Sequence, residues 1–352
     1  VILSDGTAPV TSTVTLTVNG VNDAPTVVAA PATTLSETDF ATLAGYPNSY
    51  KIITETEMYS ILGANDVDVN DSLTLSLVTD SSNFTSSNTG IDNTTSGVVQ
   101  LTAADITALG ITANVGDFFI YSLGFDGLNA SETSTATFNV ILSDGTAPVT
   151  STVTLTVDGV NDAPTVTANP ATTLSETDFA TLSGFPNSYK IITESEMYSI
   201  LGANDVDVND SLTLSLVTDS SNFTSSNTGI DNTTSGVVQL TAADITALGI
   251  TANVGDFFIY SLGFDGLNAS ETSTATFNVI LSDGTAPVTS TVTLTVNGVN
   301  DAPTVVAAPA TTLSETDFAT LAGYPNSYKI ITETEMYSIL GANDVDVNDS
   351  LT

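Results

Sequence analysis

Residues 12–18 read STVTLTV, and the same seven residues return at 151–157 and 290–296. Valine and leucine alternate with threonine, so that one face of an extended chain is apolar and the other is polar. This period of two, built mainly from β-branched residues, predicts a strand that is buried on one face. The string VNDAP follows each copy within a few residues. Its proline has no backbone N–H for a sheet ladder, so we expect the strand to end before it.

The strand belongs to a long repeat. The string VILSDGTAPV begins at Val1, Val140 and Val279, which is a period of 139 residues. Residues 1–139 and 140–278 differ only at positions 19, 28, 30, 44, 46 and 56. This period is far longer than the roughly 20–50 residues of a solenoid unit. Each repeat is therefore expected to be a domain with its own core.

The recurring proline marks the domain boundary. We expect complete repeats at 25–163 and 164–302. They are flanked by the last strands of a truncated repeat, 1–24, and by the first part of a further repeat, 303–352. Joining these two partial segments would still leave the counterpart of 75–139 missing, so we expect the polypeptide to continue in both directions.

Other short strands are predicted at 72–78, 117–123 and 135–142, where apolar and polar residues again alternate. Glycine-containing turns such as Asp126-Gly127 and Asp144-Gly145 separate them. Many short strands with turn-rich connections predict an all-β fold, a linear tandem of β-sandwich domains.

Helical signals are few. Thr102 begins the string TAADITALG, which has a capping residue at its start and closes with Gly110. Thr54 and Glu57 have the spacing of a second capping box, in a segment that ends near Gly63. Each repeat is expected to contain these two short helices and no long one.

The charge excludes several classes of partner. Forty acidic residues stand against three basic ones, a net charge of −37, which repels nucleic acid and anionic membranes. Only 12% of residues are charged and 41% are hydrophobic, so this is not the composition of a disordered acidic tail. There is no cysteine to form disulfides, and divalent metal is the expected substitute. No apolar run is long enough to predict a membrane span.

Four strings carry a resemblance to a known family. They are TVDGVNDAPT at 156–165, LSETDF at 35–40, GANDVDVNDSLTLSLV at 63–78 and VILSDG at 140–145. They resemble the cadherin-like or Ig-like tandem repeats of large, calcium-dependent, RTX-type surface adhesins of bacteria. The resemblance implies a structural extender on the bacterial cell surface, stiffened by Ca²⁺ between successive repeats. Its partners would be the neighbouring repeats of the same chain and laterally packed copies, with no nucleic acid and no membrane insertion.

The resemblance also implies a ligand set for each junction. For the junction at 158–164 these are Glu37, Asp158, Asn161, Asp162, Asp205, Asp207 and Asp283. For the junction at 297–303 they are Glu176, Asn300, Asp301, Asp344 and Asp346. For the junction at 19–25 they are Asn22, Asp23, Asp66, Asp68 and Asp144. No equivalent of the DRE motif of the family is evident.

Calcium chemistry fits these residue types. The ion takes six to eight hard oxygen ligands, which carboxylates and amide carbonyls supply. Several carboxylates at one junction repel one another unless a cation lies between them. Asp158 replaces the asparagine found at 19 and 297, so its junction is expected to bind Ca²⁺ about fivefold more tightly.

The sequence also bears on other functions. The segment Asp66 to Asp71 is not an EF-hand loop, because it lacks glycine at the sixth position and glutamate at the twelfth. We expect no enzyme: there is no histidine and no GxSxG motif. A self-assembling surface filament or lattice remains open. Tandem carbohydrate-binding modules also remain open, with a platform built from the aromatic residues Phe40, Tyr46, Tyr50, Tyr59 and Phe185. Sequons for N-glycosylation stand at Asn83, Asn93 and Asn129.

Overall fold

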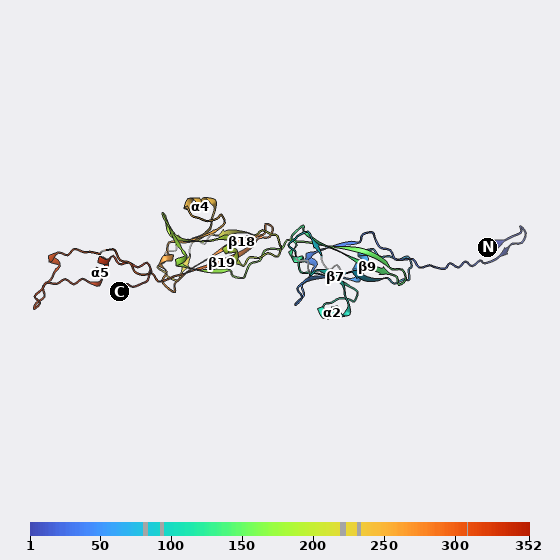
Figure 1. The fold of residues 1–352 in the computed structure, drawn as a ribbon, viewed down its shortest axis with the longest axis horizontal. Coiled ribbons are helices and arrows are strands. Elements are labelled where there is room, and N and C mark those ends of the chain that lie inside the picture. The colour runs from blue at the N-terminus through green and yellow to red at the C-terminus, as the bar shows by residue number, and fades with distance from the viewer. Residues whose placement is uncertain (80–83, 92–94, 219–222, 231–233, 308) are drawn as a thin grey trace. The chain divides into compact units, whose positions relative to one another are not determined.

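The computed structural model describes residues 1–79, 84–91, 95–218, 223–230, 234–307 and 309–352. The sequons at Asn83 and Asn93 lie outside these residues. The chain forms two compact units (Figure 1). Unit 1 contains Val1–Asn161 and Val206–Asn209, and unit 2 contains Asp162–Asp205 and Asp210–Thr352.

Unit 1 contains a sandwich of two sheets. The strands of the first sheet run in the order β3 (Ala32–Ser36), β10 (Val149–Asp158), β9 (Thr133–Ser143) and β5 (Thr74–Thr79), with β6 (Thr85–Ser86) also on β9. The second sheet has the order β4 (Ser49–Ile53), β8 (Phe118–Ser122) and β7 (Gly97–Gln100). Strand β3 runs parallel to β10, and the other pairs in both sheets are antiparallel. A separate small sheet pairs β1 (Ile2–Leu3) with β2 (Val10–Thr11).

Unit 2 repeats this topology. Its first sheet has the order β11 (Ala171–Ser175), β19 (Val288–Asn297), β18 (Thr272–Ser282) and β14 (Thr213–Thr218), with β15 (Thr224–Ser225) on β18. Its second sheet has the order β12 (Ala180–Leu182), β13 (Phe185–Ile192), β17 (Phe257–Ser261) and β16 (Gly236–Gln239). The prediction of all-β sandwich domains is confirmed.

Helices in the described residues are short. The α-helices are α1 (Glu55–Leu62), α2 (Ala103–Leu109), α3 (Glu194–Leu201), α4 (Ala242–Leu248) and α5 (Glu333–Leu340). The 3₁₀ turns are η1 (Glu37–Asp39), η2 (Phe125–Gly127), η3 (Glu176–Asp178), η4 (Phe264–Gly266) and η5 (Glu315–Asp317). None of the described helices is both long and apolar enough to cross a membrane.

The helix boundaries follow from the predicted caps. The Thr54 side chain accepts a hydrogen bond from the Glu57 backbone N–H while the Glu57 carboxylate accepts one from Thr54 N–H. The first turn of α1 therefore satisfies two of its otherwise unpaired backbone groups. Gly63 ends the helix with φ 56°, a left-handed conformation that glycine adopts without strain. Thr102 caps α2 in the same way.

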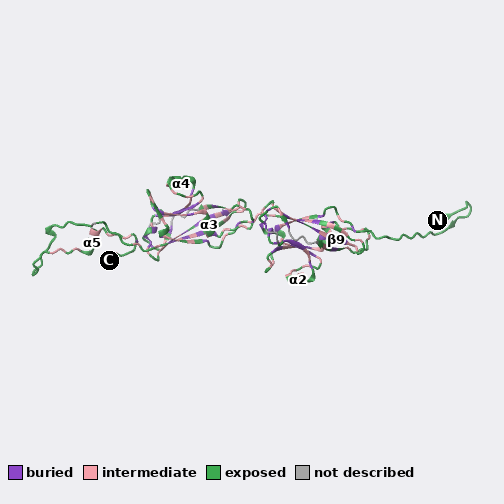
Figure 2. Ribbon diagram, in the orientation of Figure 1, coloured by how far each residue is buried: buried purple, intermediate pink, exposed green. Residues whose placement is uncertain are grey.

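The alternating strand predicted from STVTLTV supplies the core. Val153, Leu155 and Val157 on β10 are fully buried, as are their counterparts on β19. They pack with aromatic residues of the facing sheet, such as Phe118 on β8. Figure 2 shows buried residues, in purple, on the strands of both sandwiches. Each such side chain contributes about 1.5–3 kcal/mol when it leaves water.

The first copy of that strand corrects the prediction. Residues 12–18 form no strand, and Leu16 is 87% exposed and Val18 91% exposed. The copies at 151–157 and 290–296 are each hydrogen-bonded to a strand on both sides. An alternating pattern makes a strand possible, but the ladder partners and the facing sheet make it stable.

Candidate metal centre

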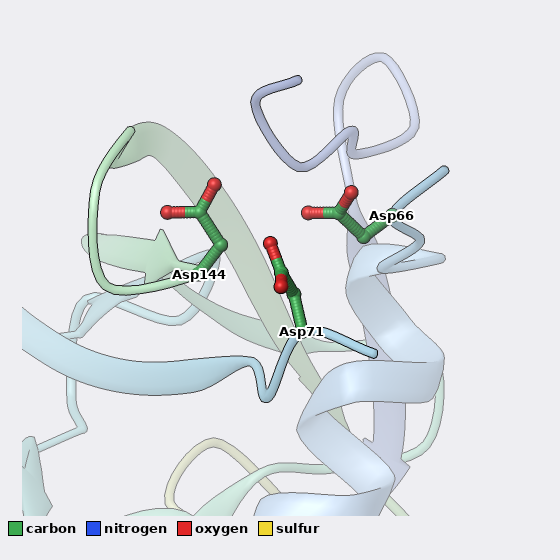
Figure 3. A group of neighbouring side chains, drawn as sticks. All are labelled: Asp66, Asp71 and Asp144. Atoms are coloured by element: carbon green, nitrogen blue, oxygen red, sulfur yellow. The ribbon is translucent and has the colours of Figure 1, made fainter. Parts of the chain in front are cut away.

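Acidic residues from two loops meet at one end of each sandwich. In unit 1, Asp66 and Asp71 lie between α1 and β5, and Asp144 lies in the turn between β9 and β10. One carboxylate oxygen of each lies within 4.8 Å of the others. Figure 3 shows the three carboxylates facing a common space. Such an arrangement brings three negative charges together without an intervening basic residue.

Backbone hydrogen bonds hold Asp144 in this position. Its Oδ1 accepts from Thr146 N at 2.6 Å and from Ala147 N at 2.7 Å, which closes the β9–β10 turn. Its Oδ2 accepts from Asn22 Nδ2 at 2.8 Å. The Ala147 N–H, then the Asn22 and Thr146 donors, hold the pKa of Asp144 well below its usual range. Asp144 is therefore ionised throughout the physiological range.

The linker is tied to the acidic loop as well. Asp23 N donates to Asp68 Oδ2 at 2.7 Å. Asp66 Oδ1 accepts from Asp68 N at 2.9 Å, which fixes the turn of the DVDVND segment. The ligands predicted for the junction at 19–25 are thus brought together: Asn22 and Asp23 contact Asp144 and Asp68, and Asp66 lies beside Asp144.

Unit 2 contains two further groups, of which the first is equivalent to that of unit 1 and the second comes from one DVDVND segment alone. Asp205, Asp210 and Asp283 lie within 4.8 Å of one another. Asp344, Asp346 and Asp349 form the other group in the same unit. A group of three acids therefore occurs at each DVDVND segment, although its members differ in the last copy.

A second, more deeply buried acidic group lies in unit 2. Glu176 opens η3 directly after β11 and is 5% exposed, and its Oε1 accepts from Val299 N at 2.7 Å. Asp346 is 2% exposed, and its Oδ2 accepts from Asp301 N at 2.7 Å. The two carboxylates hold adjacent parts of one linker. Unit 1 repeats part of this, since Glu37 Oε1 accepts from Val160 N at 2.8 Å.

This group carries uncompensated negative charge. Burial, together with the carboxylates of Asp301, Asp346 and Asp265, raises the pKa of Glu176 from its usual 4.5 to about 7, although the Val299 hydrogen bond lowers it. Burial and the neighbouring acids also raise the pKa of Asp346. Among the described residues, Lys329 and Glu335 form the one ion pair, at 3.4 Å.

The buried oxygens fit a divalent cation. Glu176 Oε2 and Asp346 Oδ1 are buried, and neither has a hydrogen-bond partner among the described residues; the same holds for Asp66 Oδ2. A buried carboxylate oxygen without a donor is costly, and a cation removes that cost. Hard carboxylate and carbonyl oxygens are the ligands that Ca²⁺ prefers, and they are the donors present.

The structure groups the predicted ligands by unit. For the junction at 297–303, Glu176, Asp301, Asp344 and Asp346 come together, while Asn300 donates to the Asp301 carbonyl at 2.7 Å. The set predicted for 158–164 is divided between the units. Unit 1 holds Glu37, Asp158, Asn161 and Asp207, and unit 2 holds Asp162, Asp205 and Asp283.

Asp158 is distinct from the other predicted ligands. It is the last residue of β10, with an exposed side chain, and is paired in the sheet with Ser36 and Thr133. It belongs to none of the three acidic groups found in the described residues. Its role as a ligand remains a prediction.

Sequence reasoning missed four acids. Asp71, Asp210 and Asp349 each complete a loop group. The signal was present, because each is the last residue of a DVDVND segment. Asp265 lies in η4, and partial desolvation and then the charge of Asp301 raise its pKa. No local motif distinguishes Asp265 from other acids that follow aromatic residues.

The aromatic residues considered as a carbohydrate platform pack against one another. The Tyr50 ring stacks on Phe119 at 5.1 Å, and Tyr46 meets the same ring edge-on at 6.1 Å. Phe119 is only 3% exposed beneath them. Tyr59 donates its hydroxyl proton to the Leu73 carbonyl at 2.8 Å and packs against the core. The three rings are half-buried, and the contacts described for them are packing contacts.

Comparison with known proteins gives weak similarity only. No family model and no curated protein matches the chain. It is similar to human Protocadherin-24 EC1-2, with 15% identity, a TM-score of 0.34 and coverage of 80% of this chain and 100% of that one. It is similar to Protocadherin Gamma C5 EC1-3, with 16% identity, a TM-score of 0.30 and coverage of 79% and 69%.

An endo-fucoidan hydrolase of glycoside hydrolase family 107 is also similar, with 14% identity and a TM-score of 0.22. The match covers 78% of this chain but 29% of the hydrolase. TM-scores this low carry no functional argument. The chain is an all-β protein of sandwich domains, as its own sheets and cores show.

Proposed function

We propose that this chain is part of the extender, or stalk, of a large extracellular bacterial adhesin, and that Ca²⁺ stiffens the junctions between its repeats. The observation that carries the proposal is the pair of buried, unpartnered oxygens at Glu176 and Asp346. Both side chains hold the linker backbone, at Val299 and Asp301. A carboxylate pair in this position holds the linker backbone.

Two sets of residues would hold the metal. Glu176 and Asp346, which are buried, would form the inner part of the site in unit 2, with the neighbouring carboxylates of Asp301 and Asp265 beside them. The loop group Asp344, Asp346 and Asp349 would form the outer part, with Asp346 shared between them. Bound Ca²⁺ would supply positive charge and coordination to oxygens that otherwise repel one another.

The residues themselves explain the stiffening. Glu176 comes from the start of one repeat, Asp301 from the linker and Asp346 from the loop of the following repeat. Repulsion among these carboxylates favours their separation in the absence of a cation. When a cation compensates them, the same carboxylates fix three segments of chain to one another, and the linker loses its freedom to bend.

Calcium titration tests the proposal. A cation that binds only the folded chain stabilises it by about 2.7 kcal/mol at roughly a hundredfold excess over Kd. We expect Ca²⁺ to raise the melting temperature, and chelator to shift the small-angle scattering profile towards a flexible chain. If chelator changed neither the melting temperature nor the maximum dimension of the chain in scattering, the proposal would be excluded.

The chain provides a matched control. Glu176→Gln removes the buried carboxylate, and we expect Ca²⁺ affinity to fall by about tenfold or more. Glu315→Gln makes the same change in the identical LSETD string, where the side chain is exposed, and should leave affinity unchanged. Equal effects of the two substitutions would show that general charge, and not this site, governs binding.

A further inference from the structure

A valine in the acidic loop of unit 2 packs directly on two glycines. Val347 lies between Asp346 and Asp349, beyond α5. A Cβ placed on Gly229 would lie 2.2 Å from Val347 Cγ1, and one on Gly266 would lie 2.9 Å from Val347 Cγ2. Only residues without a side chain allow so close an approach.

Polar contacts surround this packing. Val347 N donates to the Gly266 carbonyl at 3.3 Å, and Asn348 Nδ2 donates to Asn227 Oδ1 at 2.7 Å. The Asn268 side chain also donates to Asp349. We call the surface formed by Asn227, Gly229 and Gly266 the valine socket.

The socket is ordered by its own repeat. Gly229 N donates to Asn227 Oδ1 at 2.9 Å. Asn227 is 3% exposed, and its Nδ2 donates to Glu271 Oε2 at 2.7 Å. The same carboxylate oxygen accepts from Asn268 N at 2.8 Å. The shape of the socket therefore rests on hydrogen bonds that do not involve the loop it receives.

Unit 1 contains the same contact. Val208 meets Gly90 and Gly127, where an added Cβ would lie 2.3 and 2.9 Å from its methyl groups. Asn209 Nδ2 donates to Asn88 Oδ1 at 2.6 Å. Segment Val206–Asn209 accordingly belongs to unit 1, although residues on either side of it belong to unit 2.

The first copy of the loop has different surroundings in this chain. Val69 occupies the same position in an identical DVDVND segment and is 89% exposed, whereas Val208 is 46% and Val347 44% exposed. The difference is due to surroundings alone, because the local sequence is the same. The socket thus removes about half of the water-accessible surface of this valine.

We propose that the valine socket is a metal-independent docking surface for the acidic loop of the following repeat. Its partner is the DVDVND segment of a second copy of the same repeat, bound through a valine methyl, glycine backbone and an amide pair. These groups carry no charge, and Asp349 accepts from the Asn268 amide, so the contact does not need a cation to form. It fixes the register of successive repeats and holds Asp346 in place before metal binds.

Cysteine cross-linking tests this in the full chain, which has no cysteine of its own. A Cβ on Gly229 would lie 3.5 Å from Val347 Cβ, a spacing that a disulfide spans. We expect the Gly229→Cys, Val347→Cys double variant to form the cross-link in chelator. The effective concentration of one introduced thiol at the other should be about tenfold or more higher in this variant than in the control, Gly229→Cys with Val345→Cys. Val345 is in the same loop, 46% exposed.

The outcomes separate this inference from the calcium proposal. Equal cross-linking of the two pairs in chelator, or cross-linking that requires Ca²⁺, would overturn the docking surface and leave metal binding untouched. Efficient cross-linking in chelator together with no response to Ca²⁺ in the titration would support docking and exclude the metal. A second test measures how fast a thiol reagent labels the Val347→Cys variant. Adding Gly229→Ala to that variant should block the socket and make labelling at position 347 about tenfold faster.

Discussion

The Glu176 carboxylate is buried, whereas the glutamate at the equivalent position of the next repeat is exposed. In the string LSETDF, Ser175 caps η3 and Asp178 closes the capping box, so two of its polar residues are used locally. Glu176 instead projects to the linker and accepts from Val299 N. Its counterpart Glu315 is exposed. Local sequence therefore forms the 3₁₀ turn, and the surroundings decide whether its glutamate is buried.

The raised pKa of Glu176 predicts a pH dependence for the metal-free chain. The folded state binds this proton more tightly than the unfolded state, whose pKa is near 4.5. The contribution to stability is thus complete below pH 4.5 and is lost as pH rises through about 7. Melting temperatures in chelator should fall across this window, and the fall should be smaller in Glu176→Gln.

We expect Ca²⁺ to reverse that trend. The metal binds the ionised carboxylate, so affinity should rise as pH rises through about 7. Titrations at several pH values measure this, with Glu315→Gln as the control. A pH-independent affinity would mean that Glu176 is not a ligand.

Asp210 is a candidate ligand that only the structure identifies, and it provides a test of the loop group. It lies within 4.8 Å of Asp205 and Asp283. Replacing Asp210 with asparagine removes one of three charges, and we expect Ca²⁺ affinity in unit 2 to fall by about tenfold. Unchanged affinity would restrict binding to the buried group around Glu176.

At the scale of the element, helix α3 connects the second sheet to the acidic loop. The Thr193 side chain accepts from Glu196 N, and the Glu196 carboxylate accepts from Thr193 N at 2.7 Å. Tyr198 then donates from its hydroxyl to the Leu212 carbonyl at 2.7 Å, on the far side of the loop. The cap and the tyrosine together fix where the loop begins and ends.

Loss of the cap should therefore be measurable. We expect Thr193→Ala to destabilise the chain by about 1 kcal/mol, because an N-cap donor–acceptor pair is lost. Ser195→Ala, at an exposed position of the same helix, should change stability by less than about 0.5 kcal/mol. Urea unfolding at fixed Ca²⁺ gives both values, and similar losses would show that the capping box does not hold α3.

At the scale of the whole molecule, the net charge of −37 acts on every junction together. Three lysines cannot neutralise forty acids, so repulsion within the chain is screened mainly by dissolved ions. The proposed metal sites and the valine socket oppose this repulsion in different ways. A cation at the metal sites would compensate the negative charge, whereas the valine socket adds uncharged contacts.

This difference predicts a salt response. In chelator, raising NaCl from about 0.02 to about 0.5 M should raise the melting temperature by several degrees, because screening shortens the range of repulsion. Choline chloride should act equally, since no specific site is involved. With saturating Ca²⁺ the same salt change should have a smaller effect. A fall in melting temperature with salt in chelator would contradict repulsion as the dominant long-range force.

The sequence alone determined what depends on near neighbours. The alternation of STVTLTV predicted β10 and β19, the spacing of Thr54 and Glu57 predicted the cap of α1, and the period of 139 residues predicted the repetition of one sandwich. Each of these follows from side-chain direction or backbone hydrogen bonding over a few residues. The tandem of β-sandwiches could therefore be predicted without coordinates.

Only the tertiary structure decided which distant groups meet. It brought Asp210 to Asp283 and Asp265 near Asp301, and it left residues 12–18 without a ladder. Val69 and Val347 have identical neighbours in sequence but differ in exposure, 89% against 44%, because only Val347 has a socket. Burial and charge at these positions come from segments far away in the chain. A local sequence pattern therefore cannot predict the burial or the charge environment of these residues.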